Sequence, residues 1–68
     1  MKEIKINTEY ITLGQFLKFV AIIDIGSYAK TFLLENDVFV NGEKEERRGR
    51  KLYPDYEIEV IGEKFKVK

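Results

Sequence analysis

The stretch GSYAKTFLLENDVFVNGE, residues 26–43, changes its hydrophobic period half-way along. Apolar residues recur at helical spacing in its first half, and in VFVNGE they alternate with a period of two. We therefore expect a helix with Ser27 as its N-cap, ending near Glu35, followed by a strand. Asn36 is expected to close the helix in the left-handed conformation. The predicted inner face of the helix is Ala29, Phe32 and Leu33.

The pair Asn41-Gly42 within this stretch is a strong local signal for a type I′ hairpin turn. A strict two-residue turn places the acids Glu43 and Glu45 opposite the valines of the first strand. Acidic side chains fit poorly on an apolar face, so we expect the return strand to be short, bulged or at a sheet edge.

Upstream, TEYITLGQFLKFV (8–20) predicts a first helix. Thr12 and Gln15 have the spacing of a capping box, and we expect the helix to run to about Ile23, before a break at Gly26. Still further upstream, KEIKI (2–6) alternates and predicts a short strand. The helical spacing defines one apolar face: Leu13, Phe16, Leu17 and Val20.

Downstream, YEIEVIGEKFKVK (56–68) predicts a second hairpin, with Gly62-Glu63 as its turn. This register pairs apolar residues on one face and acids with lysines on the other. The predicted pairs are Val60–Phe65, Ile58–Val67, Glu59–Lys66 and Glu57–Lys68.

Charge is distributed unevenly along the chain. Lys and Arg number 12 and Asp and Glu also number 12, yet RRGRK (47–51) carries four positive charges. Such a cluster suits a phosphate backbone, because guanidinium groups donate to phosphate oxygens in pairs. The alternative is a solvated loop whose arginines pair with Glu43, Glu45 or Glu46, and the residues alone favour neither. The cluster consists of Arg47, Arg48, Arg50 and Lys51.

A second candidate site is GSYAK (26–30), at the expected start of the second helix. Ser27, Tyr28 and the first backbone N–H groups would form an anion site, with Lys30 within one turn. The alternative, which the residues favour, is a plain N-cap beside a surface lysine. Tyr28 would stack on an unpaired base in the first reading and be half-buried in the second.

Several classes of protein are excluded or disfavoured by composition. Without cysteine or histidine the chain has no disulfide, no thiolate metal site and no Ser–His or Cys–His catalytic pair. It has no P-loop pattern, and a magnesium site at the acidic trio 43, 45 and 46 is less favoured than solvated ion pairs. We expect no cofactor, no metal and no catalysis. The 68 residues contain no apolar run long enough to span a membrane and no signal-peptide pattern, which predicts a cytoplasmic protein.

The segments ITLGQFLKF, GSYAKTFLLENDVFVNGE and RRGRKL, in this order, resemble the S-four (alpha-L) RNA-binding domain. The likeness covers about residues 11–61 and is greatest to small stand-alone bacterial proteins of the YaaA/YbcJ type. It implies an α+β fold in which a two-helix unit packs on a small, mostly antiparallel sheet. A single domain would then span 1–68, with an N-terminal strand and a C-terminal hairpin strand flanking the motif.

The resemblance also implies a binding surface. RNA would lie across the exposed side of the helices, the start of the second helix and the basic stretch. Lys30 falls on the family's basic position, and Asn41 and Gly42 fall on its Asn-Gly turn. Ser27-Tyr28 departs from the family's usual Gly-acid pair at the start of the second helix. The family's basic stretch is matched in full by Arg47, Arg48, Arg50 and Lys51.

The leading hypothesis is therefore non-catalytic binding of structured RNA, either ribosomal or tRNA-like, through the basic loop and the start of the second helix. Two alternatives use the same loop. One is a protein-interaction adaptor that docks an acidic partner, and the other is a DNA-binding accessory factor in replication or repair. A membrane partner is not expected.

Overall fold

The computed structural model describes residues 1–68 and has an α+β fold, as predicted. Five strands form one sheet in the order β1-β7-β6-β3-β4, and β2 pairs with β5 in a separate two-stranded ladder. None of the helices has the length and apolar character needed to cross a membrane. The elements are β1 (Lys2–Ile4), β2 (Ile11–Thr12), α1 (Leu13–Phe19), a 3-10 turn η1 (Gly26–Tyr28), α2 (Ala29–Glu35), β3 (Val38–Val40), β4 (Glu43–Lys44), β5 (Lys51–Leu52), β6 (Glu57–Val60) and β7 (Glu63–Val67).

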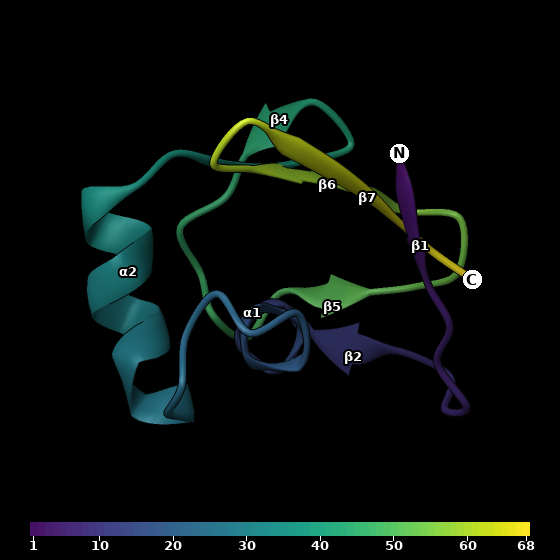
Figure 1. Cartoon of the computed structure of the whole chain (residues 1–68), viewed down its shortest axis with the longest axis horizontal. Helices are drawn as coiled ribbons and strands as arrows, with labels where there is room; N and C mark the ends of the chain where they lie inside the picture. Colours follow the sequence, from purple (N-terminus) through teal and green to yellow (C-terminus); the bar gives the residue numbers. More distant parts are fainter.

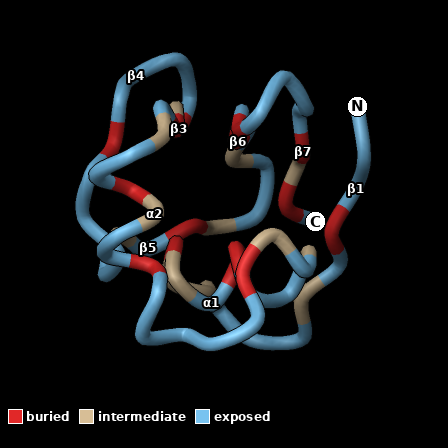
Figure 2. The backbone as a smooth tube through the Cα atoms, turned by 60° about the vertical axis from the view of Figure 1, so that its left-hand side comes forward, coloured by how far each residue is buried: buried red, intermediate tan, exposed pale blue.

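The core lies between the five-stranded sheet and the layer formed by α1 with the β2–β5 ladder, and α2 stands to one side (Figure 1). Phe16 of α1 meets Phe65 of β7 edge-on, with ring centroids 5.2 Å apart, so the helix packs directly on the sheet. Figure 2 shows buried residues in both layers, on α1 as well as on β6 and β7. The most deeply buried large side chains are Phe16, Leu13, Leu17, Leu33, Leu52, Ile58, Val38, Val40, Val60 and Val67.

Helix α1 begins where the sequence predicts. The Thr12 hydroxyl accepts from the Gln15 backbone N–H, and the Gln15 side chain accepts from the Thr12 N–H, which completes the capping box. The predicted end near Ile23 is wrong, because the helix ends at Phe19. Ala21 has a φ of 62°, and the N–H groups of residues 22 and 23 both fold back to the Leu17 carbonyl. Because the chain closes tightly after α1, Ile23 packs in the core although it lies beyond the end of the helix.

Helix α2 ends at Glu35 with Asn36 as its C-cap, as predicted, but the predicted N-cap at Ser27 and the predicted left-handed conformation of Asn36 are wrong. Ser27 lies in the 3-10 turn η1 rather than at the N-cap, and no side chain caps the first turn of α2. Asn36 is extended, with a φ of −132°, and its backbone N–H donates to the Phe32 carbonyl at 2.9 Å. Its side-chain amide donates to the same carbonyl at 3.1 Å and so reinforces the last helical bond.

The β3–β4 hairpin turns at Asn41-Gly42, where φ is 52° and 85°, as a type I′ turn requires. Its return strand is both short and at the sheet edge, as the poor fit of the acids predicts. One backbone bond extends the pairing further, from the Glu45 N–H to the Val38 carbonyl at 2.8 Å. Glu45 therefore lies at the valine strand, where its side chain is buried.

The β6–β7 hairpin turns at Ile61-Gly62, so the predicted Gly62-Glu63 turn is wrong by one residue and the pairing by two. A two-residue turn with positive φ at both positions matches the right-handed twist of the strands. A shift of two keeps every side chain on its predicted face, so acids still pair with lysines on one face, whereas Val60 on the other face now pairs with Glu63 in place of Phe65. The pairs are Glu57–Lys66, Ile58–Phe65, Glu59–Lys64 and Val60–Glu63.

The strand predicted over 2–6 forms over Lys2–Ile4 and pairs in parallel with β7. Ile4 contributes to the core, and the Lys68 N–H donates to the Ile4 carbonyl at 2.7 Å. The two ends of the chain consequently meet at one edge of the sheet (Figure 1).

Candidate functional site

The basic loop, residues 47–51, connects the edge strand β4 to β5 and lies against the start of α1. The Gly14 N–H donates to the Arg48 carbonyl at 2.9 Å, and the Leu13 N–H donates to the Arg50 carbonyl at 2.8 Å. These N–H groups belong to the first turn of α1 and have no partner inside the helix. Loop carbonyls satisfy them, so the loop backbone is fixed to the helix.

Glu45 is the buried acid behind the basic loop, with 6% of its surface exposed. Its carboxylate accepts from Arg47 Nε at 3.0 Å and Nη2 at 3.1 Å, and from Arg50 Nη1 at 2.8 Å. It also accepts from the backbone N–H groups of residues 46 and 47, at 3.1 and 3.0 Å. Glu45 thus ties two arginines and the loop backbone to one point, and we call this arrangement the Glu45 clamp.

The charge of Glu45 is stabilised by its partners. Hydrogen bonds from Arg47 and then Arg50 lower the pKa of the Glu45 carboxyl to about 2, against the opposing effect of burial. The same pairing raises the pKa of Arg47. The predicted alternative of loop arginines paired with acids is therefore correct for Glu45, whereas Glu43 and Glu46 form no ion pair.

The clamp leaves most of the positive charge available, since one carboxylate faces a loop with four cations. Arg47 remains 76% exposed, and its guanidinium has further N–H donors. Arg48 and Lys51 form no ion pair. The loop is therefore held in shape without being neutralised.

On one side of the loop is a hollow without any hydrophobic or acidic residue, which we call the polar hollow. Two cations line it, Lys18 of α1 and Arg48, and Lys18 was not among the residues singled out from sequence. Lys18 lies three residues after Gln15, so the two side chains share one exposed side of the helix. This spacing was the signal by which the sequence could have indicated Lys18. The lining residues are Thr12, Gly14, Gln15, Lys18, Gly26, Arg48 and Gly49.

Gly14 brings the start of α2 close to the loop. A Cβ at this position would lie 3.4 Å from the Ala29 Cβ and 3.4 Å from the Arg48 carbonyl oxygen. Lys30, the residue after Ala29, is exposed. The structure therefore brings together two regions that were singled out separately, the basic loop and the start of the second helix.

The remaining predicted residues of the second helix start do not share this hollow. Ser27 and Tyr28 are exposed in η1, and Tyr28 lines a different, partly apolar hollow with Ile22 and Phe32. Tyr28 has 57% of its surface exposed, so a large part of its side chain is open to solvent.

Asn41 and Gly42 lie at the β3–β4 turn and do not line the polar hollow. The Asn41 side chain accepts from the Glu57 N–H at 2.9 Å, and its backbone N–H donates to the Glu57 carbonyl at 2.7 Å. These bonds attach the turn to the next strand, β6. Asn41 therefore has a structural contact that is independent of any ligand.

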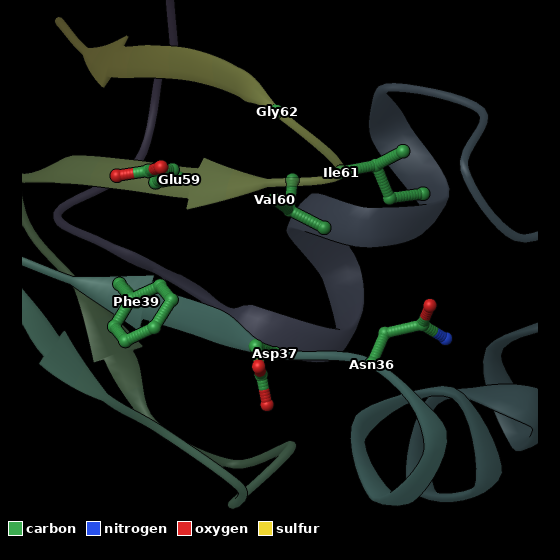
Figure 3. Close-up of a pocket in the computed structure, with 7 residues that line it drawn as sticks. All are labelled: Asn36, Asp37, Phe39, Glu59, Val60, Ile61 and Gly62. Atoms are coloured by element: carbon green, nitrogen blue, oxygen red, sulfur yellow. The ribbon is translucent and has the colours of Figure 1, made fainter.

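Acidic groups do not converge into a metal site. No three acids lie together in a geometry for a cation, and both Glu45 oxygens already accept N–H groups. A further hollow beside the β6–β7 turn includes two acids and no cation, so it is unsuited to an anion (Figure 3). Its lining residues are Asn36, Asp37, Phe39, Glu59, Val60, Ile61 and Gly62.

Comparison with known proteins identifies the family. A family model described as the S4 domain matches residues 4–68. A protein of Bacillus subtilis (strain 168), described as probable ribosome maturation protein RlbA, is 54% identical over 59 residues, covering 87% of this chain and 83% of that protein. No solved structure matches significantly. The chain belongs to the S4 domain family, which confirms the resemblance to the S-four domain.

Proposed function

We propose that this S4-domain chain binds structured RNA without catalysis, and that the basic loop is its main contact. The observation that carries the proposal is the Glu45 clamp, which fixes a cationic loop in shape while leaving Arg48 and Lys51 unpaired. A fixed loop loses little conformational freedom when it meets phosphates, which favours binding.

The contact surface that we propose extends from the basic loop across the polar hollow to the start of α2. Lys18 and Arg48 would meet phosphates on one side of the loop, and Lys30 would extend the surface along α2. Structured RNA is recognised largely by its backbone and 2′-OH groups, so such a surface needs no deep groove. Asn41, Gly42, Ser27 and Tyr28 stay predictions as direct contacts.

The RNA class that we propose is ribosomal. The similar Bacillus subtilis protein is described as a probable ribosome maturation protein, and its similarity extends over most of both chains. The proposal includes a cytoplasmic location and a single binding unit formed by residues 1–68. DNA and an acidic protein are the competing partners for the same cations, and they are decided by the experiment below.

The test uses two triple variants that each remove three positive charges. Lys18→Ala/Arg48→Ala/Lys51→Ala removes cations beside the loop without touching the Glu45 clamp. Lys5→Ala/Lys64→Ala/Lys66→Ala removes three lysines that lie outside the basic loop and the polar hollow and form no ion pair. Binding of an RNA hairpin and the matching DNA hairpin is measured by fluorescence anisotropy at two salt concentrations, after circular dichroism shows that both variants are folded.

We expect the first variant to lose roughly 100-fold in RNA affinity, because three phosphate contacts of about 1 kcal/mol each are removed. The control should change little. The proposed surface has six cations, the four of the basic loop together with Lys18 and Lys30. If five of the six each neutralise a phosphate, log K of the wild type should fall with log salt with a slope of about −3 to −5. A slope near zero, or equal losses in both variants, contradicts the proposal. Equal binding of DNA would move the assignment to nucleic acid in general, and binding to neither would favour an acidic protein.

A further inference from the structure

We propose that the other side of the basic loop holds a single unpaired nucleotide of the bound RNA. This inference rests on the function proposed above and adds what that function leaves open, the kind of RNA feature recognised. The site is a second hollow, which we call the aromatic hollow. Its lining residues are Arg47, Gly49, Arg50, Lys51, Tyr53 and Tyr56.

The two hollows beside the loop differ in chemistry. Gly49 lines both of them, so they meet at the loop itself. The polar hollow has no aromatic residue, whereas the aromatic hollow combines three cations with two tyrosines and contains no acid. Cations suit a phosphate in either place, but only the tyrosines offer a flat apolar surface. A nucleotide needs both, a cation for its phosphate and a ring for its base.

The aromatic wall is held in place before any ligand arrives. The Tyr53 ring packs against Tyr10 at 5.5 Å and against Tyr56 at 5.8 Å between centroids, so it is supported on two sides. Lys51 Nζ lies 4.9 Å from the Tyr10 centroid. The cationic wall is fixed as well, because the Arg50 guanidinium bonds to Glu45 and lies 5.9 Å from the Tyr56 ring. Preorganised walls reduce the entropy lost on binding.

The combination favours an unpaired nucleotide over the other anionic ligands. Bases inside a helix are stacked on their neighbours and present only their edges, so a continuous duplex cannot use the tyrosine rings. An acidic peptide would use the cations and leave the rings without a partner. A bulged or loop nucleotide exposes a base face next to its own phosphate, which matches the arrangement of Tyr53 and Tyr56 beside Arg47 and Arg50.

The test compares three RNA hairpins with the same stem. One has no bulge, one has a single bulged nucleotide, and one has an abasic residue at the bulge. Affinity is measured by anisotropy with each hairpin. The chain has no tryptophan and four tyrosines, so stacking is followed independently through quenching of tyrosine fluorescence. We expect the bulged hairpin to bind about tenfold more tightly than either other hairpin, with quenching only for the bulged one.

Variants assign the effect to the aromatic hollow. Tyr53→Leu/Tyr56→Leu removes the rings and should abolish the tenfold preference without weakening the unbulged hairpin. Tyr53→Phe/Tyr56→Phe keeps both rings and should retain the preference, which covers the case in which the leucine variant fails to fold. Phe39→Leu removes an aromatic ring from β3, outside the aromatic hollow and outside the proposed RNA surface, so it is the matched control and should behave as the wild type.

Equal affinity for all three wild-type hairpins would overturn the inference, and so would an undiminished bulge preference in a folded leucine variant. Salt-sensitive binding of the unbulged hairpin without a bulge preference would leave the proposed function standing and remove only the nucleotide site. Failure of every hairpin to bind would overturn both.

Discussion

The two hairpins of this molecule start from the same turn geometry and have different outcomes. Each turns through two residues of positive φ, Asn41-Gly42 in one and Ile61-Gly62 in the other. The β6–β7 hairpin continues as a ladder in which acids face lysines on the exposed side. The β3–β4 hairpin stops after Lys44, and the next residue, Glu45, accepts hydrogen bonds from Arg47 and Arg50 of the basic loop.

The comparison shows that the surroundings of a glutamate decide its structural role. Glutamates 57 and 59 in the long ladder are exposed opposite lysines, and such surface pairs contribute little to stability. Glu45 stands on the apolar face of its strand, where an acid needs several donors, and the loop arginines supply them. Glu45 occupies a position where an apolar residue is expected, and it therefore holds Arg47 and Arg50 in place.

The largest change in stability is expected at the Asn41-Gly42 turn, whose residue types suit positive φ. Asn41→Ile places a β-branched residue at a φ of 52° and removes the bond to the Glu57 N–H, so it should lower the free energy of unfolding by about 2–3 kcal/mol. Asn41→Gly accepts the same φ and loses only the side-chain bond, so it should cost about 1 kcal/mol. Urea denaturation measures both. Equal costs for the two variants would show that the backbone conformation is not what Asn41 supplies.

The next effect tests the Glu45 clamp. Glu45→Gln keeps the shape but loses the charge, and we expect it to lower the free energy of unfolding by about 1–2 kcal/mol. The same change at Glu59 should cost less than about 0.5 kcal/mol. If the clamp positions the loop, Glu45→Gln also weakens RNA binding although it removes a negative charge. Tighter RNA binding would mean that Glu45 acts only by lowering the local charge.

Lowering the pH should remove the contribution of the Glu45 clamp to the free energy of unfolding. The pKa of Glu45 is about 2 in the folded chain and near 4.5 without its partners, so the folded state favours the ionised carboxyl. Its stabilisation is complete above pH 4.5 and is lost as the pH falls toward 2. The difference in unfolding free energy between wild type and Glu45→Gln should shrink across this range in urea titrations. A difference independent of pH would contradict the lowered pKa.

The smallest expected effect is a gain in stability at Ile61. Ile61 is 63% exposed and has a φ of 49°, a conformation that β-branched residues rarely adopt. Ile61→Asn should raise the free energy of unfolding by about 0.5–1 kcal/mol, because asparagine tolerates this region and little apolar contact is lost. Ile25→Asn is the matched control, since Ile25 is 53% exposed with a φ of −124°. The midpoint of thermal unfolding should rise for Ile61→Asn and should not rise for Ile25→Asn.

Signals confined to a few neighbouring residues could be predicted from the sequence. The capping box at Thr12 and Gln15 and the turn at Asn41-Gly42 both depend on local backbone bonds, and both form as predicted. The second turn was missed because Ile61 adopts a φ that its side chain disfavours. Pairing along the rest of the ladder compensates, and a shift of two residues leaves the hydrophobic pattern unchanged.

The candidate site was predictable in its charges and unpredictable in its architecture. The four cations of the basic loop stand together in the sequence, but the burial of Glu45 depends on the fold of the edge strand. Lys18 reaches the polar hollow only because the loop packs on α1. Tyr53 and Tyr56 stand close to Arg47 and Arg50 in the sequence, but only the fold of residues 47–56 shows that their side chains line one hollow.

The parallel pairing of β1 with β7 has a consequence for the order of folding. Residues 2–4 and 65–67 form neighbouring strands, so this contact closes a loop of nearly the whole chain. Closure entropy rises with loop length, by about 0.6 kcal/mol for each doubling, and contacts of long sequence separation slow folding. The two hairpins and α1 depend on nearer neighbours. We therefore expect β1 to dock last, with amide hydrogens of β1 exchanging with solvent faster than those of β6.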